Sequence, residues 1–357
     1  MMRVLFIIEG LDRGGKERQL YEITRLMSGN DDMTVGVITF NMGGHYSKLL
    51  KECVDFYREI PKRPLKIQPF YKILGPIKLF NPDIIHTWDS LSTMFALIPS
   101  KLLNIPIVDG SIRDSGVDRG WQYYFRRFFL KRARLIIANS QAGLRYYKVD
   151  GQVIYNAIDT GRFKKPSSRK RVVMIMVASF SDYKDQKTFL DAAALLIEEG
   201  IIHKAILAGD GKFLSHFKQY VNEFLQRASH SIEFLGAISN VEEILEECTY
   251  GVLCSTSKYG EGISNSLLEY MAAGVISLAT DIGGSQEIIE DGVNGFLFSE
   301  GNSQQLFELI RNAELNSEMR ASVLGKASLT ISSKFSYRGN VTKIIEQYQL
   351  MISSHHG

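Results

Sequence analysis

Two segments of this 357-residue chain repeat the same order of features: a short apolar run, a loop and an amphipathic helix. The apolar runs are residues 4–8 and residues 172–178, and both have the length of a buried parallel strand. After each loop, residues of one helical face recur at i, i+3, i+4 and i+7. They are Leu20, Ile23, Thr24 and Met27 in the first segment and Phe189, Ala192, Ala193 and Leu196 in the second. This order, found twice, predicts two doubly wound α/β domains with Rossmann-like parallel sheets.

The chain is long enough for two domains of ordinary size. A polar, basic stretch at residues 163–171 contains Pro166, Ser167 and Ser168 and predicts the linker between them. We therefore expect one domain in residues 1–165, a second in residues 166–335, and a C-terminal helix in residues 336–357. The apolar face of this helix consists of Val341, Ile344, Ile345 and Tyr348.

The two halves of the chain differ in charge. Residues 1–165 contain 26 Lys and Arg against 16 Asp and Glu, a net charge of +10. Residues 166–357 contain 16 against 23, a net charge of −7. A basic first half indicates an anionic partner for that half.

Composition favours a cytoplasmic protein that does not itself span a membrane. No run approaches the roughly 18 apolar residues of a membrane-spanning helix. Cys53, Cys248 and Cys254 are odd in number and lack the spacing of a metal site, which favours a reducing compartment. We expect no nucleic-acid partner.

Residues 261–269 read EGISNSLLE, two carboxylates with seven residues between them. Ser264, Asn265 and Ser266 are helix N-cap residues, and the apolar positions that follow predict a helix that begins inside the motif. The amides and the positive dipole end of such a helix favour a phosphate group. A phosphate between Glu261 and Glu269 fits a nucleotide sugar, whose ribose and hexose hydroxyls would donate to the two carboxylates. Alone, the spacing also fits two surface glutamates on a solvated helix.

The loops after the two predicted first strands contain further candidates. Gly14 and Gly15 precede a helix and would let a ligand approach backbone amides, although a plain tight turn explains a glycine pair equally well. The G-x-G-x-x-G and P-loop spacings are absent. Lys184, in the second loop, is placed to neutralise a diphosphate, or is a solvated loop lysine.

In its context, YGEGISNSLLEYMAAGVISLATDIGGSQEIIEDGVNGFLF, the motif resembles the nucleotide-sugar site of retaining glycosyltransferases of the GT-B fold, family 4 type (group 1). Six more blocks resemble the family in its order. They are the loop at 14–18, PDIIHTW around His86, IIANS ending at Ser140, VIYNAID at 153–159, YKDQKTFLDAA after residue 182, and LAGDG at 207–211. The resemblance implies two domains that face a central cleft, the first on the acceptor side and the second binding the nucleotide sugar. It implies that the C-terminal helix crosses back to pack on the first domain. It also implies transfer of a hexose from a nucleoside diphosphate sugar to an acceptor hydroxyl of a lipid-linked or cell-surface glycan precursor.

The same resemblance assigns roles in the donor site. Glu269 would bind the nucleotide ribose, Glu261 would meet sugar hydroxyls or the anomeric centre, and Lys184 would stabilise the leaving diphosphate. The family places an Arg shortly before this Lys, where this chain has Ser179, so Lys184 or another base such as Lys187 would take over its charge. The expected donor-binding residues are Gly14, Gly15, Ser179, Lys184, Glu261, Gly262, Ile263, Ser264, Asn265, Ser266, Leu267 and Glu269.

The resemblance also implies front-side attack assisted by the leaving phosphate rather than a glycosyl-enzyme intermediate. No D-x-D-like motif stands out, and the positive charges above make a divalent ion unnecessary. We expect no metal and no cofactor, with the nucleotide sugar as co-substrate.

Candidates for the acceptor side follow strands of the first half. His86 ends an apolar run, and an imidazole with a pKa near neutrality would orient an acceptor or touch the transferred sugar as a catalytic residue. Trp88 stands where relatives often have a second His. Asn139 and Asn156 follow other strand-like runs. The alternatives are a hydrogen-bonded core histidine, a packed tryptophan, and ordinary cap or turn residues.

Residues 119–134, RGWQYYFRRFFLKRAR, contain six bases and no acid. At helical spacing Trp121, Tyr124, Phe125, Phe128 and Phe129 share a face. One interpretation is a core helix with a solvated basic side. The other is a helix on an anionic membrane surface, which would make the protein peripheral at the inner face of the membrane. The residues expected to meet the membrane are Trp121, Arg126, Arg127 and Lys131.

Two rival functions remain open. A nucleotide-sugar epimerase of the same architecture would turn over its substrate without any acceptor. A catalytically silent sugar-binding module would bind without turnover.

Overall fold

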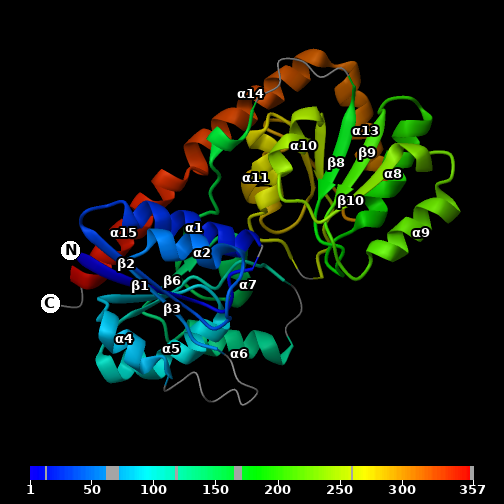
Figure 1. Cartoon of the computed structure of the whole chain (residues 1–357). Helices are drawn as coiled ribbons and strands as arrows, with labels where there is room; N and C mark the ends of the chain where they lie inside the picture. The colour runs from blue at the N-terminus through cyan, green and yellow to red at the C-terminus, as the bar shows by residue number, and fades with distance from the viewer. Residues whose placement is uncertain (13, 62–71, 117–119, 165–170, 259, 354–357) are drawn as a thin grey trace. The chain divides into compact units, whose positions relative to one another are not determined.

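The computed structural model describes residues 1–12, 14–61, 72–116, 120–164, 171–258 and 260–353. The chain forms two compact α/β units (Figure 1). Unit 1 consists of Met1–Arg113, Asp118–Asn156 and Tyr337–Gly357, and unit 2 of Asp114–Val117 and Ala157–Ser336. The chain passes into unit 2 at Ala157, earlier than the boundary expected between residues 165 and 166, two positions that lie outside the described residues.

Unit 1 is built on a seven-stranded parallel sheet of order β3-β2-β1-β4-β5-β6-β7. Its strands are β1 (Met2–Ile8), β2 (Met33–Thr39), β3 (Phe56–Glu59), β4 (Ile84–Thr87), β5 (Ile107–Asp109), β6 (Leu135–Ala138) and β7 (Gln152–Val153). The apolar run that we interpreted as the first strand forms β1, and Phe6 in its middle pairs with Val37 on one side and His86 on the other.

Helices cover both faces of this sheet. They are α1 (Gly15–Ser28), α2 (His45–Cys53), α4 (Leu74–Phe80), α5 (Ser90–Leu103), α6 (Trp121–Leu130), α7 (Gln141–Tyr147) and α15 (Tyr337–Ser353). The side chains of Asp89 and Ser140 cap α5 and α7 by accepting from the amides of Ser92 and Gly143. Helices α4 and α5 bury Ile77, Phe80 and Phe95 against apolar strand residues and form one core of the unit.

Helix α15 belongs to unit 1 although it ends the chain (Figure 1). It packs against α1 and buries Val341, Ile344 and Tyr348. The hydroxyl of Tyr348 lies 2.5 Å from Nδ1 of His86 on β4. Three of the four apolar residues predicted for this helix are therefore buried, and the fourth, Ile345, is partly buried.

Unit 2 has a six-stranded parallel sheet of order β10-β9-β8-β11-β12-β13. The strands are β8 (Val173–Val177), β9 (Lys204–Ala208), β10 (Ile232–Gly236), β11 (Tyr250–Leu253), β12 (Ile276–Thr280) and β13 (Phe296–Phe298). The helices are α8 (Gln186–Glu198), α9 (Leu214–Phe224), α10 (Val241–Glu247), α11 (Asn265–Ala272), α12 (Ser285–Ile288), α13 (Ser303–Leu315) and α14 (Ser317–Lys334), with 3₁₀ turns η1 (Thr160–Arg162) and η2 (Ser229–Ser231). The predicted face of α8 is fully buried.

The expected α/β class with two parallel sheets is confirmed, and both sheets share one topology. The first strand of each unit lies inside its sheet, and the chain adds strands on one side of it before crossing to the other. The crossing falls between β1 and β4 in unit 1 and between β8 and β11 in unit 2. Loops that leave such neighbouring strands diverge and open a crevice at the carboxyl edge of the sheet. Functional side chains are therefore expected after these four strands.

The described helices include none that is both long and apolar enough to cross a bilayer.

Candidate functional site

In unit 2 the two loops at the crossing point meet through Lys184, Ser255 and Glu261. Lys184 follows β8, and Nζ of this residue forms an ion pair with Glu261, which follows β11. The hydroxyl of Ser255 lies 3.2 Å from Lys184 Nζ and 3.1 Å from Glu261 Oε2. The Lys184 side chain is only 8% exposed, so its ammonium depends on these partners in the absence of a ligand.

The backbone around Glu261 is held tightly. The Glu261 carbonyl accepts hydrogen bonds from the Gly284 amide at 2.7 Å and the Ser115 hydroxyl at 2.6 Å. A Cβ on Gly284 would lie 2.3 Å from the Gly262 carbonyl oxygen, so a larger residue does not fit there. Gly260 has a φ of +58°, a left-handed conformation that glycine adopts without strain. The loop thus presents the Glu261 carboxylate in a fixed position.

Helix α11 begins directly after this loop, as the sequence predicted. Ser264 is its N-cap residue but makes no side-chain cap bond to the helix. Ser266 instead donates its hydroxyl to the Val177 carbonyl at 2.7 Å and ties the helix to the end of β8. The positive end of the α11 dipole is therefore not covered by a capping side chain of Ser264, an arrangement that favours an anion there.

The remaining motif residues differ in what they can offer a ligand. Ile263 and Leu267 bury their side chains in unit 2, so only their main-chain atoms are suited to bind a donor. Asn265 is half-buried in the first turn. Glu269 lies in the second turn of α11 and is 4% exposed. A carboxylate at this depth requires polar partners from the protein or from a ligand.

The structure distinguishes Lys184 from Lys187 as the base that could supply the charge of the missing family arginine. Ser179 follows β8 and is exposed, with its hydroxyl 3.0 Å from that of Ser181. Lys187 points to the surface of α8, where it pairs with Asp191 at 2.5 Å. Lys184 is therefore the base of this loop that lies beside Glu261 and the start of α11.

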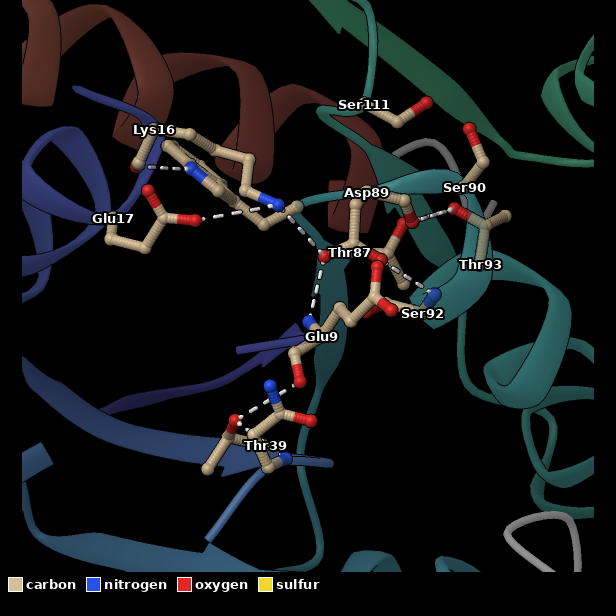
Figure 2. Close-up of polar contacts among 12 residues, drawn as sticks. Glu9, Lys16, Glu17, Thr39, Thr87, Asp89, Ser90, Ser92, Thr93 and Ser111 are labelled. Atoms are coloured by element: carbon tan, nitrogen blue, oxygen red, sulfur yellow. Dashed lines mark hydrogen bonds and ion pairs between the residues drawn. The ribbon is translucent and has the colours of Figure 1, made fainter. Parts of the chain in front are cut away.

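Unit 1 has a corresponding polar cluster at its own crossing point (Figure 2). Asp89, after β4, accepts from the backbone amide of Glu9 at 2.7 Å, and Glu9 follows β1. Lys16 in the first turn of α1 lies 3.6 Å from Asp89 and 3.5 Å from Glu17. The Trp88 indole donates to the Lys16 carbonyl at 3.0 Å. These contacts fasten the β1 loop to the end of β4.

The Gly14-Gly15 pair sits beside this cluster, with Gly14 as the N-cap of α1. Gly14 has a φ of −169°, an extended conformation that any residue adopts. A Cβ there would meet only the end of the flexible Glu17 side chain. Its role as a source of amides for a ligand stays a prediction.

The four acceptor candidates come together around Arg113, in a cavity of about 20 Å³ that has room for one water molecule. Arg113 follows β5, places its guanidinium 4.1 Å from the centre of the Trp88 ring, and donates to Asn156 Oδ1 at 3.1 Å. His86 and Asn139 also line the cavity. Among the described residues, their buried atoms Nε2 and Oδ1, and Nε of Arg113, have no hydrogen-bond partner.

The environment of His86 corrects the expected titration near neutrality. The side chain is fully buried, and Nδ1 is bonded to Tyr348. Burial, with a smaller contribution from the nearby Arg113 charge, lowers the pKa of His86 to about 3. The imidazole is therefore neutral at physiological pH. Burial also lowers the pKa of Arg113 to about 10, which leaves it charged.

Comparison with known proteins agrees with this arrangement of two similar units. Residues 157–327 match the family model described as "Glycosyl transferases group 1", and residues 13–162 match that of "Glycosyltransferase Family 4". The chain belongs to this glycosyltransferase family. The first match contains Lys184 and the Glu261–Glu269 motif, and the second contains His86.

Two curated relatives illustrate the range of the family. A putative glycosyltransferase of Bacillus subtilis, EpsD, is 31% identical over 176 residues, which make up 49% of this chain and 45% of EpsD. This chain therefore matches about half the length of that relative. The second relative is an α-1,4-N-acetyl-D-galactosaminyltransferase of Campylobacter jejuni, which is named for a GalNAc-containing glycan on PP-undecaprenol. It is 22% identical over 319 residues, and the match covers 83% of this chain and 84% of the Campylobacter enzyme.

Among solved structures, HepE of Anabaena in complex with UDP-glucose superimposes with a TM-score of 0.82. The two chains are 24% identical, and the match covers 98% of this chain and 100% of HepE. This likeness establishes the fold, which is GT-B.

Three residues of the clusters described above were not among the residues predicted from the sequence: Ser255, Asp89 and Arg113. Each lies within four residues of the end of a strand, at β11, β4 and β5 respectively. A rule that inspects every polar residue after a crossing-point strand finds Ser255 and Asp89. Arg113 follows the next strand outward, and only the structure places it beside Trp88.

The expected membrane residues of α6 divide into two groups. Trp121 and Lys131 are exposed, whereas Arg126 and Arg127 turn towards unit 1 and bond to it. The aromatic residues that one interpretation placed in a core are mostly at the surface.

Proposed function

We propose that the protein is a retaining glycosyltransferase that moves a hexose from a nucleoside diphosphate sugar to an acceptor hydroxyl of a lipid-linked or cell-surface glycan precursor. The observation that carries the proposal is the buried Lys184–Glu261 pair at the start of α11, at the crossing point of unit 2. Each of these groups suits one feature of the reaction. The Lys184 ammonium suits the diphosphate, the Glu261 carboxylate suits sugar hydroxyls, and the helix N-terminus suits the negative charge that develops on the leaving phosphate.

The first step we propose is binding of the donor by exchange of partners. A diphosphate that reaches the start of α11 would take the Lys184 ammonium from Glu261 as its counter-ion. The carboxylate of Glu261 would then accept hydrogen bonds from hydroxyls of the hexose. Glu269 would accept from the ribose. We propose that the Gly14-Gly15 loop of unit 1 likewise offers amides to a ligand phosphate.

The chemical step follows from the charge that leaves. As the sugar–phosphate bond breaks, negative charge grows on the β-phosphate, and Lys184 with the α11 dipole stabilises it. The acceptor hydroxyl attacks from the same face, and the leaving phosphate takes its proton. His86 is neutral, so we assign it, with Asn139 and Asn156, to hydrogen bonding on the acceptor side. Trp88, whose only donor bonds to Lys16, would help to orient the acceptor through its ring.

Two further parts of the proposal come from relatives and from composition. HepE is seen with UDP and with UDP-glucose, so a UDP-sugar is the first donor to test. The Campylobacter enzyme is named for a lipid-linked glycan, which supports an acceptor of that kind. No disulfide joins Cys53, Cys248 and Cys254 to one another, as suits a protein at the cytoplasmic side of a membrane.

The experiment that tests the proposal is incubation of the purified protein with UDP-, GDP- and dTDP-sugars, with and without membrane lipid extract as acceptor. We expect one sugar nucleotide to be consumed only when extract is present, with the sugar recovered in the lipid fraction and its anomeric configuration retained. Conversion of the donor without extract would identify an epimerase. Tight binding with no conversion under either condition would identify a silent module.

We predict that Glu269→Gln weakens UDP binding by roughly 10- to 100-fold, because the ribose loses a charged acceptor worth about 1.5–3 kcal/mol. Glutamine keeps the volume of the buried side chain, so packing of α11 is preserved. Calorimetric titration with UDP and with 2′,3′-dideoxy-UDP measures the effect. The dideoxy ligand should bind wild type and variant equally, and an equal loss for both ligands would remove Glu269 from the ribose site.

We also predict that transfer continues in EDTA. Lys184 and the α11 dipole supply the positive charge that a divalent ion supplies in metal-dependent transferases. The described part of the chain contains no cluster of three or more His, Cys, Asp or Glu side chains suited to a metal ion. The initial rate in 5 mM EDTA should stay within about twofold of the untreated rate. Loss of activity that Mg²⁺ or Mn²⁺ restores would contradict the proposed mechanism.

A further inference from the structure

Helix α6 turns an aromatic face to the surface of unit 1. Trp121, Tyr124, Phe125 and Phe128 are 72%, 64%, 41% and 50% exposed. Single exposed apolar residues are common on protein surfaces, but four large aromatic side chains within eight residues are not. The opposite side of the helix, with Tyr123 and Leu130, is buried in unit 1.

Hydrogen bonds fix this orientation of α6. Arg126 Nε lies 2.9 Å from the Ser90 hydroxyl, and another nitrogen of the same guanidinium lies 3.1 Å from the Ser111 carbonyl. Arg127 Nε donates to the Tyr147 carbonyl at 2.9 Å. Because both arginines point inward, rotation of the helix to bury its aromatic residues would break all three bonds. The exposed aromatic face is thus a specified feature of the fold.

The neighbouring helices continue this apolar surface. Helices α4, α5 and α6 lie along one side of the unit 1 sheet, and α5 packs against both of the others (Figure 1). Helix α5 exposes Ile98 at 55% and Leu102 at 69%, and α4 exposes Leu79 at 69%. We call the seven exposed side chains of these helices the apolar face: Leu79, Ile98, Leu102, Trp121, Tyr124, Phe125 and Phe128.

The charged residues within the three helices have one sign. Helices α4, α5 and α6 contain no Asp or Glu. Exposed bases on them and in the turn after α6 are Lys78, Lys101, Lys131, Arg132 and Arg134. The Arg132 guanidinium lies 3.3 Å from the centre of the Phe128 ring, so it accompanies an aromatic residue at the surface. Apolar side chains and bases are therefore interleaved rather than segregated.

We propose that the apolar face docks on the surface of an anionic phospholipid bilayer. Tryptophan and tyrosine favour the boundary between headgroups and acyl chains, and each base near an anionic surface adds about 1 kcal/mol of attraction. A second copy of the chain would bring the same positive charge to the contact and be repelled. A layer of lipid phosphates, negative over its whole extent, complements three helices that contain bases and no carboxylate.

Docking on lipid would give the protein access to an acceptor that is confined to the membrane. That consequence rests on the proposed function, whereas the docking itself rests only on the surface of unit 1. A binding experiment without nucleotide sugar or acceptor therefore tests the docking separately from the enzyme activity.

The test is flotation of the full chain with vesicles of phosphatidylcholine alone and of phosphatidylcholine with 30% phosphatidylglycerol. Wild type should float with the anionic vesicles, lose most of this binding in 0.5 M NaCl, and ignore the neutral vesicles. The double variant Trp121→Ser, Phe128→Ser should bind at least tenfold more weakly. Lys131→Glu with Lys101→Glu should weaken binding by roughly fivefold or more for each base removed.

The matched control is Phe224→Ser with Leu329→Ser, two side chains of unit 2 that are 69% and 65% exposed. This variant should float like wild type, and circular dichroism should show that all variants are folded. Failure of the wild-type protein to bind anionic vesicles at low salt would overturn the proposal. An equal loss of vesicle binding in the control variant and in the α6 variant would also overturn it. Light scattering that shows a dimer lost in the α6 variant, without vesicle binding, would assign the face to self-association instead.

Discussion

Replacement of Lys184 by alanine is expected to lower the rate of sugar transfer by about 100- to 1000-fold, the usual effect of removing a group that stabilises a leaving charge. Binding of UDP should weaken by roughly 10- to 100-fold, and binding of uridine should not change, because the ammonium meets the diphosphate and not the nucleoside. Steady-state kinetics and calorimetry with the two ligands measure these effects. Parallel losses for UDP and uridine would show that the lysine has only a structural role.

Lys187→Ala is the matched control. Lys187 is three residues away, but it lies at the surface of α8 and pairs with Asp191. Its removal should leave transfer and UDP affinity within about twofold of wild type. If both lysine variants lose activity to the same extent, the diphosphate is not met specifically by Lys184.

The ion pair between Lys184 and Glu261 adds a second way to separate structure from chemistry. Removing Lys184 leaves Glu261 without its counter-ion, and breaking a fully buried pair costs about 3–5 kcal/mol of stability. The loss here should be smaller, because the Glu261 side chain is 20% exposed. The neutral pair Lys184→Met, Glu261→Gln should recover most of the free energy of unfolding without recovering transfer. Recovery of both would mean that the pair only supports the loop.

The sequence was sufficient for the parts of the fold and site that depend on local pattern. Apolar runs predicted the strands β1 and β8. Helical spacing predicted the buried face of α8, which consists of Phe189, Ala192, Ala193 and Leu196. Cap residues placed the start of α11 inside the motif. Lys184 followed from its place in the loop after an apolar run, and Glu261 from its spacing to Glu269 across a predicted helix start. The structure brings the two side chains into contact.

Contacts between distant parts of the chain could not be predicted in this way. His86 is buried because Tyr348, 262 residues later, covers it, and no local pattern reports that distance. For α6, periodicity showed which residues share a face but not which face points inward. One interpretation buried the five aromatic residues in the core. Hydrogen bonds from Arg126 and Arg127 instead orient the helix so that most of these rings are exposed. Long basic side chains reach hydrogen-bond acceptors that the rings cannot use.

His86 should make the folded state sensitive to mild acid. Its pKa of about 3 in the folded protein lies far below the value of about 6.5 in an unfolded chain. Between these values the unfolded state binds one more proton than the folded state, so the free energy of unfolding falls as pH falls below 6.5. From pH 7.5 to pH 5 this single site should remove about 2 kcal/mol of stability.

His86→Phe tests the prediction, because phenylalanine fits among the neighbouring rings of Phe6 and Trp88 but cannot bind a proton. Urea unfolding measures the free energy of unfolding of both proteins at pH 7.5 and at pH 5. Between these two pH values the variant should lose about 2 kcal/mol less than wild type, whatever its stability at pH 7.5. His216→Phe, at an exposed position of α9, is the control and should keep the wild-type dependence on pH. An unchanged dependence in His86→Phe would contradict the burial of a neutral imidazole.

Nuclear magnetic resonance of ring-labelled histidine observes the same group directly. One of the seven histidine signals should remain that of a neutral ring at pH 5, and this signal should be absent from His86→Phe. The charged neighbour that opposes protonation is Arg113, and Tyr348 occupies Nδ1, so only Nε2 is left to meet a ligand. An imidazole with a pKa of about 3 is a poor general base near pH 7 and has no imidazolium proton to donate as an acid. Substitutions of His86 should therefore lower the transfer rate by a constant factor between pH 6 and 8, because the residue orients the acceptor and the leaving phosphate accepts the proton.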